Sequence, residues 1–382
     1  MNHDHDAVVV GGGIAGANCA LQLARAGLDD VTILESEEPA SKASGRAAGS
    51  ITTYRHERFG AEASRFGREL YEEFEAAHDD LTFHRERSYS VAYTEAGADY
   101  LREEREELAV DSEFLTAEEL AERETVFGTD EVTGALRIEE AVYTDPKQLT
   151  LAAHAAAREE GVELVIGTAR DVVSEDGRVT VETAGDDHAA PVVVVAAGAW
   201  TKRLLQRAGT DLALRPRTSQ IAILEPSEPT EFPIWSAPDF SVYGRPTPEG
   251  RLLFGGGTSR PISDLEGFRT RAFVPFLGQV AERGPYVMPA LSDATLHDDW
   301  AGRVSATPDR YPHIGETDIE GLYVCAGFNG EGISNSAFGA RLLADLVVGR
   351  DPILDPSLFD PTRYPGDETF EISNAVEWWA DR

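Results

Sequence analysis

Lysine, cysteine and methionine are scarce in this chain of 382 residues, and it has no long apolar run. Lysine stands only at Lys42, Lys147 and Lys202. The two cysteines, Cys19 and Cys325, lack the spacing of metal ligands and are too few for a disulfide framework, so we expect buried thiols and no metal site. Without a stretch of membrane-spanning length, and with no basic region in the opening MNHDHDAVVV, we expect a cytoplasmic protein without a membrane span.

Acidic residues outnumber basic ones by 68 to 34, which gives a formal net charge of −34. The acids are dispersed along the chain rather than gathered in one tail. This pattern indicates a halophilic surface, because concentrated salt screens the repulsion between carboxylates. An acidic docking face for a basic partner is the alternative interpretation. Nucleic acid is excluded as a natural partner of such a surface.

A strand, turn, helix and strand follow one another in the first 35 residues. The apolar run Ala7–Val10 leads directly into GGGIAG, and a helical pattern then continues to about Ala26 and ends at Gly27. A second apolar run ends at Glu35. This order within about 30 residues predicts a βαβ unit that binds a dinucleotide.

Each glycine of that pattern, and the acid after it, has a physical task in dinucleotide binding. Gly11 permits a sharp turn, Gly13 lets a pyrophosphate approach the backbone, and Gly16 lets the helix lie close to the sheet. The helix N-terminus favours negative charge. Glu35 can accept hydrogen bonds from ribose hydroxyls and would repel a 2′-phosphate. The motif alone does not separate a flavin from a nicotinamide dinucleotide.

Later segments extend the same sheet and interrupt it twice. The four valines of Val192–Val195 predict a strand buried on both faces, and residues 321–349 predict a strand, a glycine-rich loop and a helix. We therefore expect an α/β fold with a Rossmann-like dinucleotide domain (residues 1–81, 145–214 and 301–350). A second, largely antiparallel-sheet substrate domain is inserted in two segments (82–144 and 215–300), and residues 351–382 form an acidic C-terminal extension.

Four blocks of the sequence resemble FAD-dependent amine and amino-acid oxidoreductases of the D-amino acid oxidase superfamily, and they occur in the same order as in that family. They are SGRAAG at 44–49, VVVVAAGAW at 192–200, WAGRVSATPDRYPHIG at 300–315 and AGFNGEGISNS at 326–336. Within that superfamily, the chain resembles sarcosine oxidase β-subunits, glycine oxidases and D-amino acid dehydrogenases. The resemblance implies FAD rather than a nicotinamide cofactor, bound at the two glycine-rich regions.

The resemblance also implies the reaction, oxidation of the C–N bond of a small amino acid such as sarcosine, glycine or a D-amino acid. A hydride passes from the substrate C–H to flavin N5, and the imine is hydrolysed afterwards. Oxygen or an electron carrier is the final acceptor, and an oligomer is possible. Two alternatives stay open: an FAD-binding subunit that passes electrons to a partner, and a 2-hydroxy-acid or glycerol-phosphate dehydrogenase on the same fold.

The residues expected to contact FAD come from these blocks and from the βαβ unit. They are Gly11, Gly13, Ile14, Ala15, Gly16, Glu35, Ser44, Arg46, Ala48, Arg170, Gly198, Gly327, Asn329, Gly330, Gly332 and Ile333. His154, in an alanine-rich helix, is interpreted as structural.

Three positions depart from the family's pattern. Val304 and Ser334 stand where relatives carry the arginine or lysine of the active site, and Gly302 stands where some carry a flavin-linking cysteine. We therefore expect non-covalent FAD and a different carboxylate anchor. The candidates are Arg46, Arg55, Arg245 and Arg303, and we expect Arg245 or Arg303 to hold the carboxylate, with Tyr243 as a neutral donor and Arg46 nearer the flavin.

Overall fold

The computed structural model describes residues 2–54, 58–108, 110–175, 177–257 and 259–372. Its central layer is a six-stranded sheet in which every neighbouring pair is parallel except the pair at one edge, between the strands His313–Glu316 and Leu322–Ala326. The strand order is β18 (His313–Glu316), β19 (Leu322–Ala326), β12 (Val192–Val195), β2 (Ala7–Val10), β3 (Val31–Glu35) and β8 (Glu163–Ile166). β2 and β3 are completely buried, as parallel strands covered on both faces should be.

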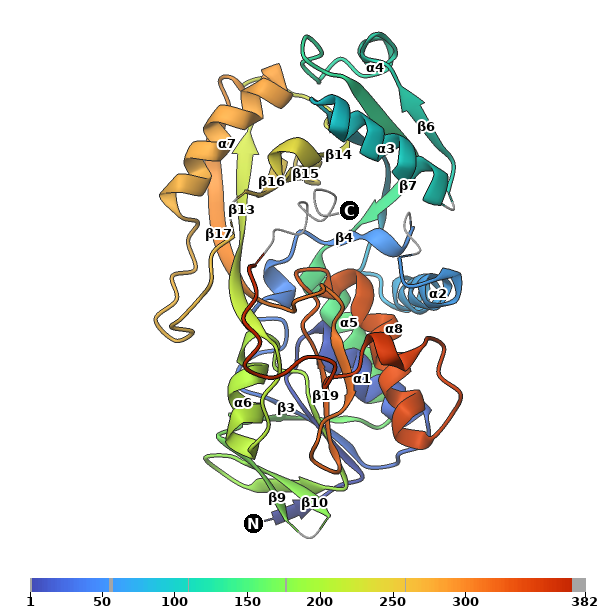
Figure 1. Ribbon diagram of the computed structural model, residues 1–382, viewed down its shortest axis with the longest axis vertical. Coiled ribbons are helices and arrows are strands. Elements are labelled where there is room, and N and C mark those ends of the chain that lie inside the picture. Colours follow the sequence, from blue (N-terminus) through green and yellow to red (C-terminus); the bar gives the residue numbers. More distant parts are fainter. Residues whose placement is uncertain (1, 55–57, 109, 176, 258, 373–382) are drawn as a thin grey trace.

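Helices cover both faces of this sheet (Figure 1). One face carries α1 (Ile14–Arg25), α5 (Pro146–Glu159) and α8 (Gly332–Val348), with α2 (Ala61–Ala77) packed against α8. The other face carries α6 (Thr201–Ala208) and a small sheet in the order β1 (Asn2–Asp4), β11 (Asp187–Ala190), β10 (Arg178–Glu182) and β9 (Asp171–Glu175). The helix α1 stops at residue 25, and the turn out of it passes through Gly27 at φ +106°. That backbone conformation suits glycine, as the sequence predicted.

A second, curved sheet of mainly antiparallel strands forms the other half of the molecule. Its order is β17 (Thr295–Ala306), β13 (Arg215–Glu225), β16 (Leu252–Gly256), β15 (Val242–Pro246), β14 (Ile234–Ala237), β5 (His84–Ala92), β7 (Gly134–Tyr143) and β4 (Ser50–Ile51), with β6 (Ser112–Leu115) also paired to β7. The β14–β5 pair alone is parallel among the described pairs of this sheet. α4 (Ala117–Arg123) and α7 (Val274–Val287) pack on one face of this sheet. α3 (Glu95–Glu107) packs on the opposite face, against Ala92, Leu136 and Ile138.

The strand pairing crosses the expected domain limits at two places. β4 lies in the first expected dinucleotide segment but pairs with β7 of the second sheet. β17 runs through position 300 without interruption and joins both halves. Residues 351–372 pack on the body: Phe359 is buried, and its carbonyl accepts a hydrogen bond from the Ile314 N–H at 2.9 Å. The expected limits stay a prediction, and Trp378 and Trp379 lie outside the described residues.

Candidate active site

A cavity of about 1230 Å³ lies between the six-stranded sheet and the curved sheet. Its lining combines the carboxyl ends of β2 and β3, the starts of α1 and α8, and residues of β13, β14, β15 and β17. Seven basic and six acidic described residues line it, although the chain as a whole has a net charge of −34. The cavity is therefore far less negative than the surface, which suits anionic ligands.

The glycine turn between β2 and α1 brings three backbone segments into close contact. Gly11 has φ +116°, and a Cβ there would lie 2.6 Å from the Ala196 carbonyl oxygen. A Cβ on Gly16 would lie 1.8 Å from the Gly11 carbonyl oxygen. No larger residue fits at Gly16 unless α1 moves away from the sheet.

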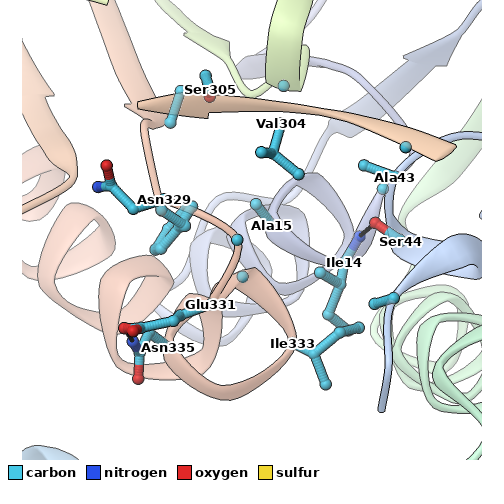
Figure 2. A pocket seen from close by; sticks show the side chains of 18 of the residues that line it. Ile14, Ala15, Ala43, Ser44, Val304, Ser305, Asn329, Glu331, Ile333 and Asn335 are labelled. Carbon is cyan, nitrogen blue, oxygen red and sulfur yellow. Dashed lines mark hydrogen bonds between the residues drawn. The ribbon is translucent and has the colours of Figure 1, made fainter. Parts of the chain in front are cut away.

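The first turn of α1 is open to an anion. The N-cap residue, Gly13, has no side chain to cap the helix, no acidic residue stands in the first turn, and a Cβ on Gly13 would lie 2.9 Å from Ser44 Oγ. Figure 2 shows the Ile14 N–H donating to Ser44 Oγ, a hydrogen bond of 3.0 Å. This cradle fits a pyrophosphate at a helix N-terminus.

Glu35 and His154 hold the backbone of one residue of the turn, Gly12, on its two sides. The Gly12 N–H donates to Glu35 Oε2 at 2.6 Å, and His154 Nε2 is 2.9 Å from the Gly12 carbonyl oxygen. Glu35 Oε1 accepts hydrogen bonds from Ser36 Oγ and the Glu37 N–H, both at 2.9 Å. Burial lowers the pKa of His154, which favours the neutral ring. The Glu35 carboxylate is thus fixed at the cavity wall, with lone pairs still open to a ribose.

The second glycine-rich region forms the opposite wall, between β19 and α8. Asn329 has φ +55°; its side chain donates to the Gly327 carbonyl oxygen at 2.6 Å and accepts from the Thr307 N–H at 3.1 Å. The loop is thereby tied to the end of β17, whose Val304 side chain points toward Ile14 and Ala15 (Figure 2). Residues from both ends of the chain line the cavity here.

Fourteen of the sixteen residues expected to contact FAD line this cavity, and Gly16 and Arg170 do not. Gly16 is buried beneath the turn. Arg170 is exposed on the loop before β9, and its carbonyl oxygen accepts a hydrogen bond from Arg207, which does line the cavity. No observation of the structure brings the Arg170 side chain to the cofactor, so that expectation stays a prediction.

Tyr243 lines the cavity on its curved-sheet side, whereas Arg245 does not line it. Burial raises the pKa of Tyr243, against the opposing effect of Arg217 and Arg245, so the phenol stays protonated and can donate. Arg245 is 8% exposed, donates to the carbonyl oxygens of Ala48 and Pro246, and lies 4.4 Å from the Tyr143 ring centre. Its guanidinium group is therefore already bound to these two backbone carbonyl groups.

Arg303 and Arg46 line the cavity near its dinucleotide side. Arg303 lies over the Trp200 ring at 4.7 Å and donates to the Leu265 carbonyl oxygen. Burial is the main cause that lowers the pKa of Arg303, and the charge of Arg46 lowers it further. The pKa of Glu37 is lowered mainly by Lys42 and, to a smaller extent, by Arg303 and Arg46. The two cations therefore lie in the same region of the cavity, near Glu37 in the segment that follows β3. Arg55 lies outside the described residues.

The hydroxyl group of Ser334 is held by two backbone groups. Its Oγ accepts from the Thr52 N–H at 2.9 Å and donates to the Ser50 carbonyl oxygen at 3.1 Å, and the residue is 2% exposed. It ties α8 to β4. Val304 and Gly302 line the cavity without a polar side chain.

Sequence reasoning missed a charged cluster where the cavity meets the start of α8. Arg58, Arg310 and Glu331 all line the cavity there. Arg58 Nη1 donates to Glu331 Oε2 at 3.2 Å, and Arg310 Nη2 lies 3.9 Å from Glu331 Oε1. Arg310 stands inside the block at 300–315 and has φ +66°. The presence of this basic residue in a block shared with the family was the signal by which the sequence could have indicated the cluster.

Cys19 and Cys325 are both buried free thiols, as expected. Burial and the neighbouring Cys325 thiol raise the pKa of Cys19, with the Cys325 hydrogen bond as the larger cause. Across the described ranges, no group of three or more potential ligands could hold a metal ion. No helix in the part of the chain that the structure describes is long and apolar enough to cross a membrane.

The fold and the cavity define a two-part, dinucleotide-binding oxidoreductase. The chain belongs to the family described as FAD dependent oxidoreductase (DAO), whose model matches residues 6–346. The resemblance inferred from the four blocks, the fold class and the choice of FAD are confirmed. The cradle at α1, the Glu35 carboxylate and the glycine-rich loop before α8 all fit that cofactor.

Individual relatives agree with this membership. The chain is 30% identical over 379 residues to 4-methylaminobutanoate oxidase (formaldehyde-forming) of Paenarthrobacter nicotinovorans, covering 94% of this chain and 45% of that protein. It is 27% identical to the mitochondrial dimethylglycine dehydrogenase of Rattus norvegicus, with 94% and 45% covered. The chain thus spans less than half the length of these two relatives. The crystal structure of glycine oxidase from Geobacillus kaustophilus superposes with a TM-score of 0.83 at 27% identity, covering 95% of this chain and 99% of that one.

Proposed function

We propose that the protein oxidises the C–N bond of a small amino acid, of the sarcosine, glycine or D-amino acid type, with FAD. The observation that carries this proposal is that one cavity is lined both by the dinucleotide turn and by the curved sheet. Val304 and the loop before α8 line it between them. A substrate between the two sheets would meet the reactive end of a cofactor held at α1. Relatives named for oxidation of methylated amines and of glycine support the same substrate class.

The residues that hold the cofactor follow from the geometry. The first turn of α1 and Ser44 would hold the pyrophosphate, with Arg46 and Arg303 as counter-charges, and Glu35 would bind the ribose. When bound, FAD would accept the hydride from the substrate C–H. Because Gly302 offers no thiol, the cofactor is held without a covalent bond.

The protein's own contribution is to position the substrate and exclude water. Tyr243, kept protonated by burial, can donate a hydrogen bond from the curved sheet. Ser90 and Ser236 lie on the same side, with their Oγ atoms 2.8 Å apart. Small polar groups of this kind orient a small substrate without supplying a strong base. The expectation that Arg245 or Arg303 holds the carboxylate stays a prediction; Arg303 lines the cavity, whereas Arg245 does not.

A substrate screen under two acceptors tests the proposal. Purified protein in high salt is offered sarcosine, glycine, D-alanine and D-proline, once with oxygen and once with an artificial electron-accepting dye. We expect turnover of at least one compound, and the better acceptor shows whether oxygen or a carrier takes the electrons. Turnover of glycerol phosphate or a 2-hydroxy acid instead would contradict the proposal. A cytoplasmic location and a possible oligomer belong to it as expectations.

A further inference from the structure

We propose that Arg58 and Arg310 form the site that binds the substrate carboxylate, and that Glu331 occupies this site when no substrate is present. The inference rests on the proposed function, because it assigns a subsite of the same cavity. It differs from the family's anchor positions, which are Val304 and Ser334 here. Both arginines line the cavity at its α8 end.

The first step is that the two guanidinium groups converge on a single carboxylate. Arg58 Nη1 is 3.2 Å from Glu331 Oε2, and Arg310 Nη2 is 3.9 Å from Glu331 Oε1. The first contact is a hydrogen bond, whereas the second is an ion pair too long to be one. Glu331 thus shows, with its own side chain, where a carboxylate would lie between the two arginines.

The second step is that both arginines are held in place independently of a substrate. Arg58 donates to the Arg310 carbonyl oxygen at 3.4 Å and lies over the rings of Phe59 and Tyr311, at 5.0 Å and 5.3 Å. The Arg310 side chain is 11% exposed, and its left-handed backbone is rare for a residue that is not glycine. Backbone strain at a cavity wall is a frequent sign of a functional position.

The third step is the charge balance. Within this cluster, the side chains of Arg58, Arg310 and Glu331 sum to one positive charge. The neighbouring Asp309 does not cancel it, because Arg363 binds that carboxylate through Nε and Nη2 at 2.8 Å and 2.9 Å. Glu331 can remain attached to Asn335, whose Nδ2 donates to Oε2 at 3.0 Å, while a substrate carboxylate takes its place on the arginines.

The experiment combines calorimetry with steady-state kinetics on the FAD-loaded protein. Acetate serves as an unreactive carboxylate for isothermal titration, and sarcosine and 4-methylaminobutanoate serve as substrates. The variants are Arg58→Met, Arg310→Asn and Glu331→Gln. Asparagine is chosen at position 310 because it tolerates the left-handed backbone. Arg65→Met is the matched control, since that exposed arginine pairs only weakly with Glu69, at 3.8 Å.

We expect Arg58→Met and Arg310→Asn each to weaken acetate binding and to raise KM for both substrates by about tenfold or more, because each variant removes one of the two cations that face the carboxylate. Glu331→Gln should tighten acetate binding and lower KM, because the internal competitor is neutralised. Arg65→Met should change neither quantity. The visible flavin spectrum should be that of the parent protein in all four variants, which shows that the cofactor site is intact.

Two results would overturn the inference. One is unchanged acetate affinity and KM in both arginine variants, with turnover of sarcosine or 4-methylaminobutanoate retained; the proposed function would then stand without this anchor. The other is weaker acetate binding and a higher KM in Glu331→Gln, which would give Glu331 a binding role of its own. If no amino acid is oxidised by the parent protein, the proposed function fails, whatever the acetate titration shows.

Discussion

The Gly12 N–H donates a 2.6 Å hydrogen bond to the Glu35 carboxylate, which joins the phosphate turn to the end of the next strand. Glu35→Gln should therefore do more than remove a ribose contact. The new amide can present an N–H to the Gly12 donor, or lose one of the bonds that Oε1 accepts. We expect FAD affinity to fall by about tenfold, as for loss of a charge-assisted hydrogen bond. Fluorimetric titration of apoprotein with FAD measures it, with the exposed Glu38→Gln as control.

Gly16 and Gly278 form a matched pair of helical glycines. A Cβ on Gly16 meets the Gly11 carbonyl oxygen at 1.8 Å, whereas one on Gly278 in α7 meets nothing within 4 Å. Gly16→Ala should abolish FAD binding and lower the melting temperature. Gly278→Ala should be neutral or stabilising, by up to about 1 kcal/mol. Equal FAD binding in the two variants would contradict the packing described for α1.

The flavin should be released when the protein is precipitated with acid. Gly302 stands at the position where some relatives carry a linking cysteine, and Cys325 is a buried thiol in the cavity wall. Absorbance of the supernatant and the pellet measures the release. Colour retained in the pellet would point to Cys325, or to His56, which lies outside the described residues.

His313 should make the fold sensitive to acid. Burial, and then the charge of Arg363, lower the pKa of His313 to about 4, and its Nδ1 lies 2.8 Å from Arg363 Nη1. The unfolded chain binds the proton at a higher pH, so stability is complete above about 6.5 and is lost as pH falls toward 4. The loss from this group is on the order of 3 kcal/mol. Urea unfolding of the parent and of His313→Gln between pH 7.5 and 4.5 measures it.

The variant His313→Gln should show a weaker dependence of stability on pH over that interval. His297→Gln is the control, because its side chain is 48% exposed. If the parent and His313→Gln lose stability in parallel, His313 is not the group responsible.

Salt should stabilise the fold. With a net charge of −34, carboxylate repulsion reaches about 10 Å at 0.1 M salt but only about 3 Å at 1 M. The melting temperature should therefore rise steeply with KCl. A flat response between low and molar salt would count against a halophilic surface.

The fold could be predicted in large part because its signals are local. The Rossmann-like sheet is predicted by short segments of sequence, namely the buried valines of β2 and β12 and the glycines at 11, 13 and 16. The small sheet on its other face was not predicted as a separate layer. It depends on β1 pairing in parallel with β11, which begins at Asp187, and no local pattern announces a pairing across that distance.

The candidate site divides in the same way. Glu35 and the glycine turn belong to one continuous motif, so their neighbourhood could be inferred from spacing. Arg58 and Arg310 are 252 positions apart, and only the docking of the loop after β17 beside residue 58 brings them together. Arg245 is buried, and its guanidinium group donates a hydrogen bond to the Ala48 carbonyl oxygen. The sequence alone gives no sign of either feature.

Anaerobic titration of the purified flavoprotein with sarcosine, followed by its visible absorption spectrum, tests the central claim most directly. D-proline and 4-methylaminobutanoate are titrated in the same way, and dimethylamine, which lacks a carboxylate, is the matched comparison. The account predicts a yellow protein whose visible flavin band is bleached by at least one of the amino acids and far less by dimethylamine. A colourless protein that FAD does not reconstitute, or a flavin band that no amino acid bleaches, would contradict it.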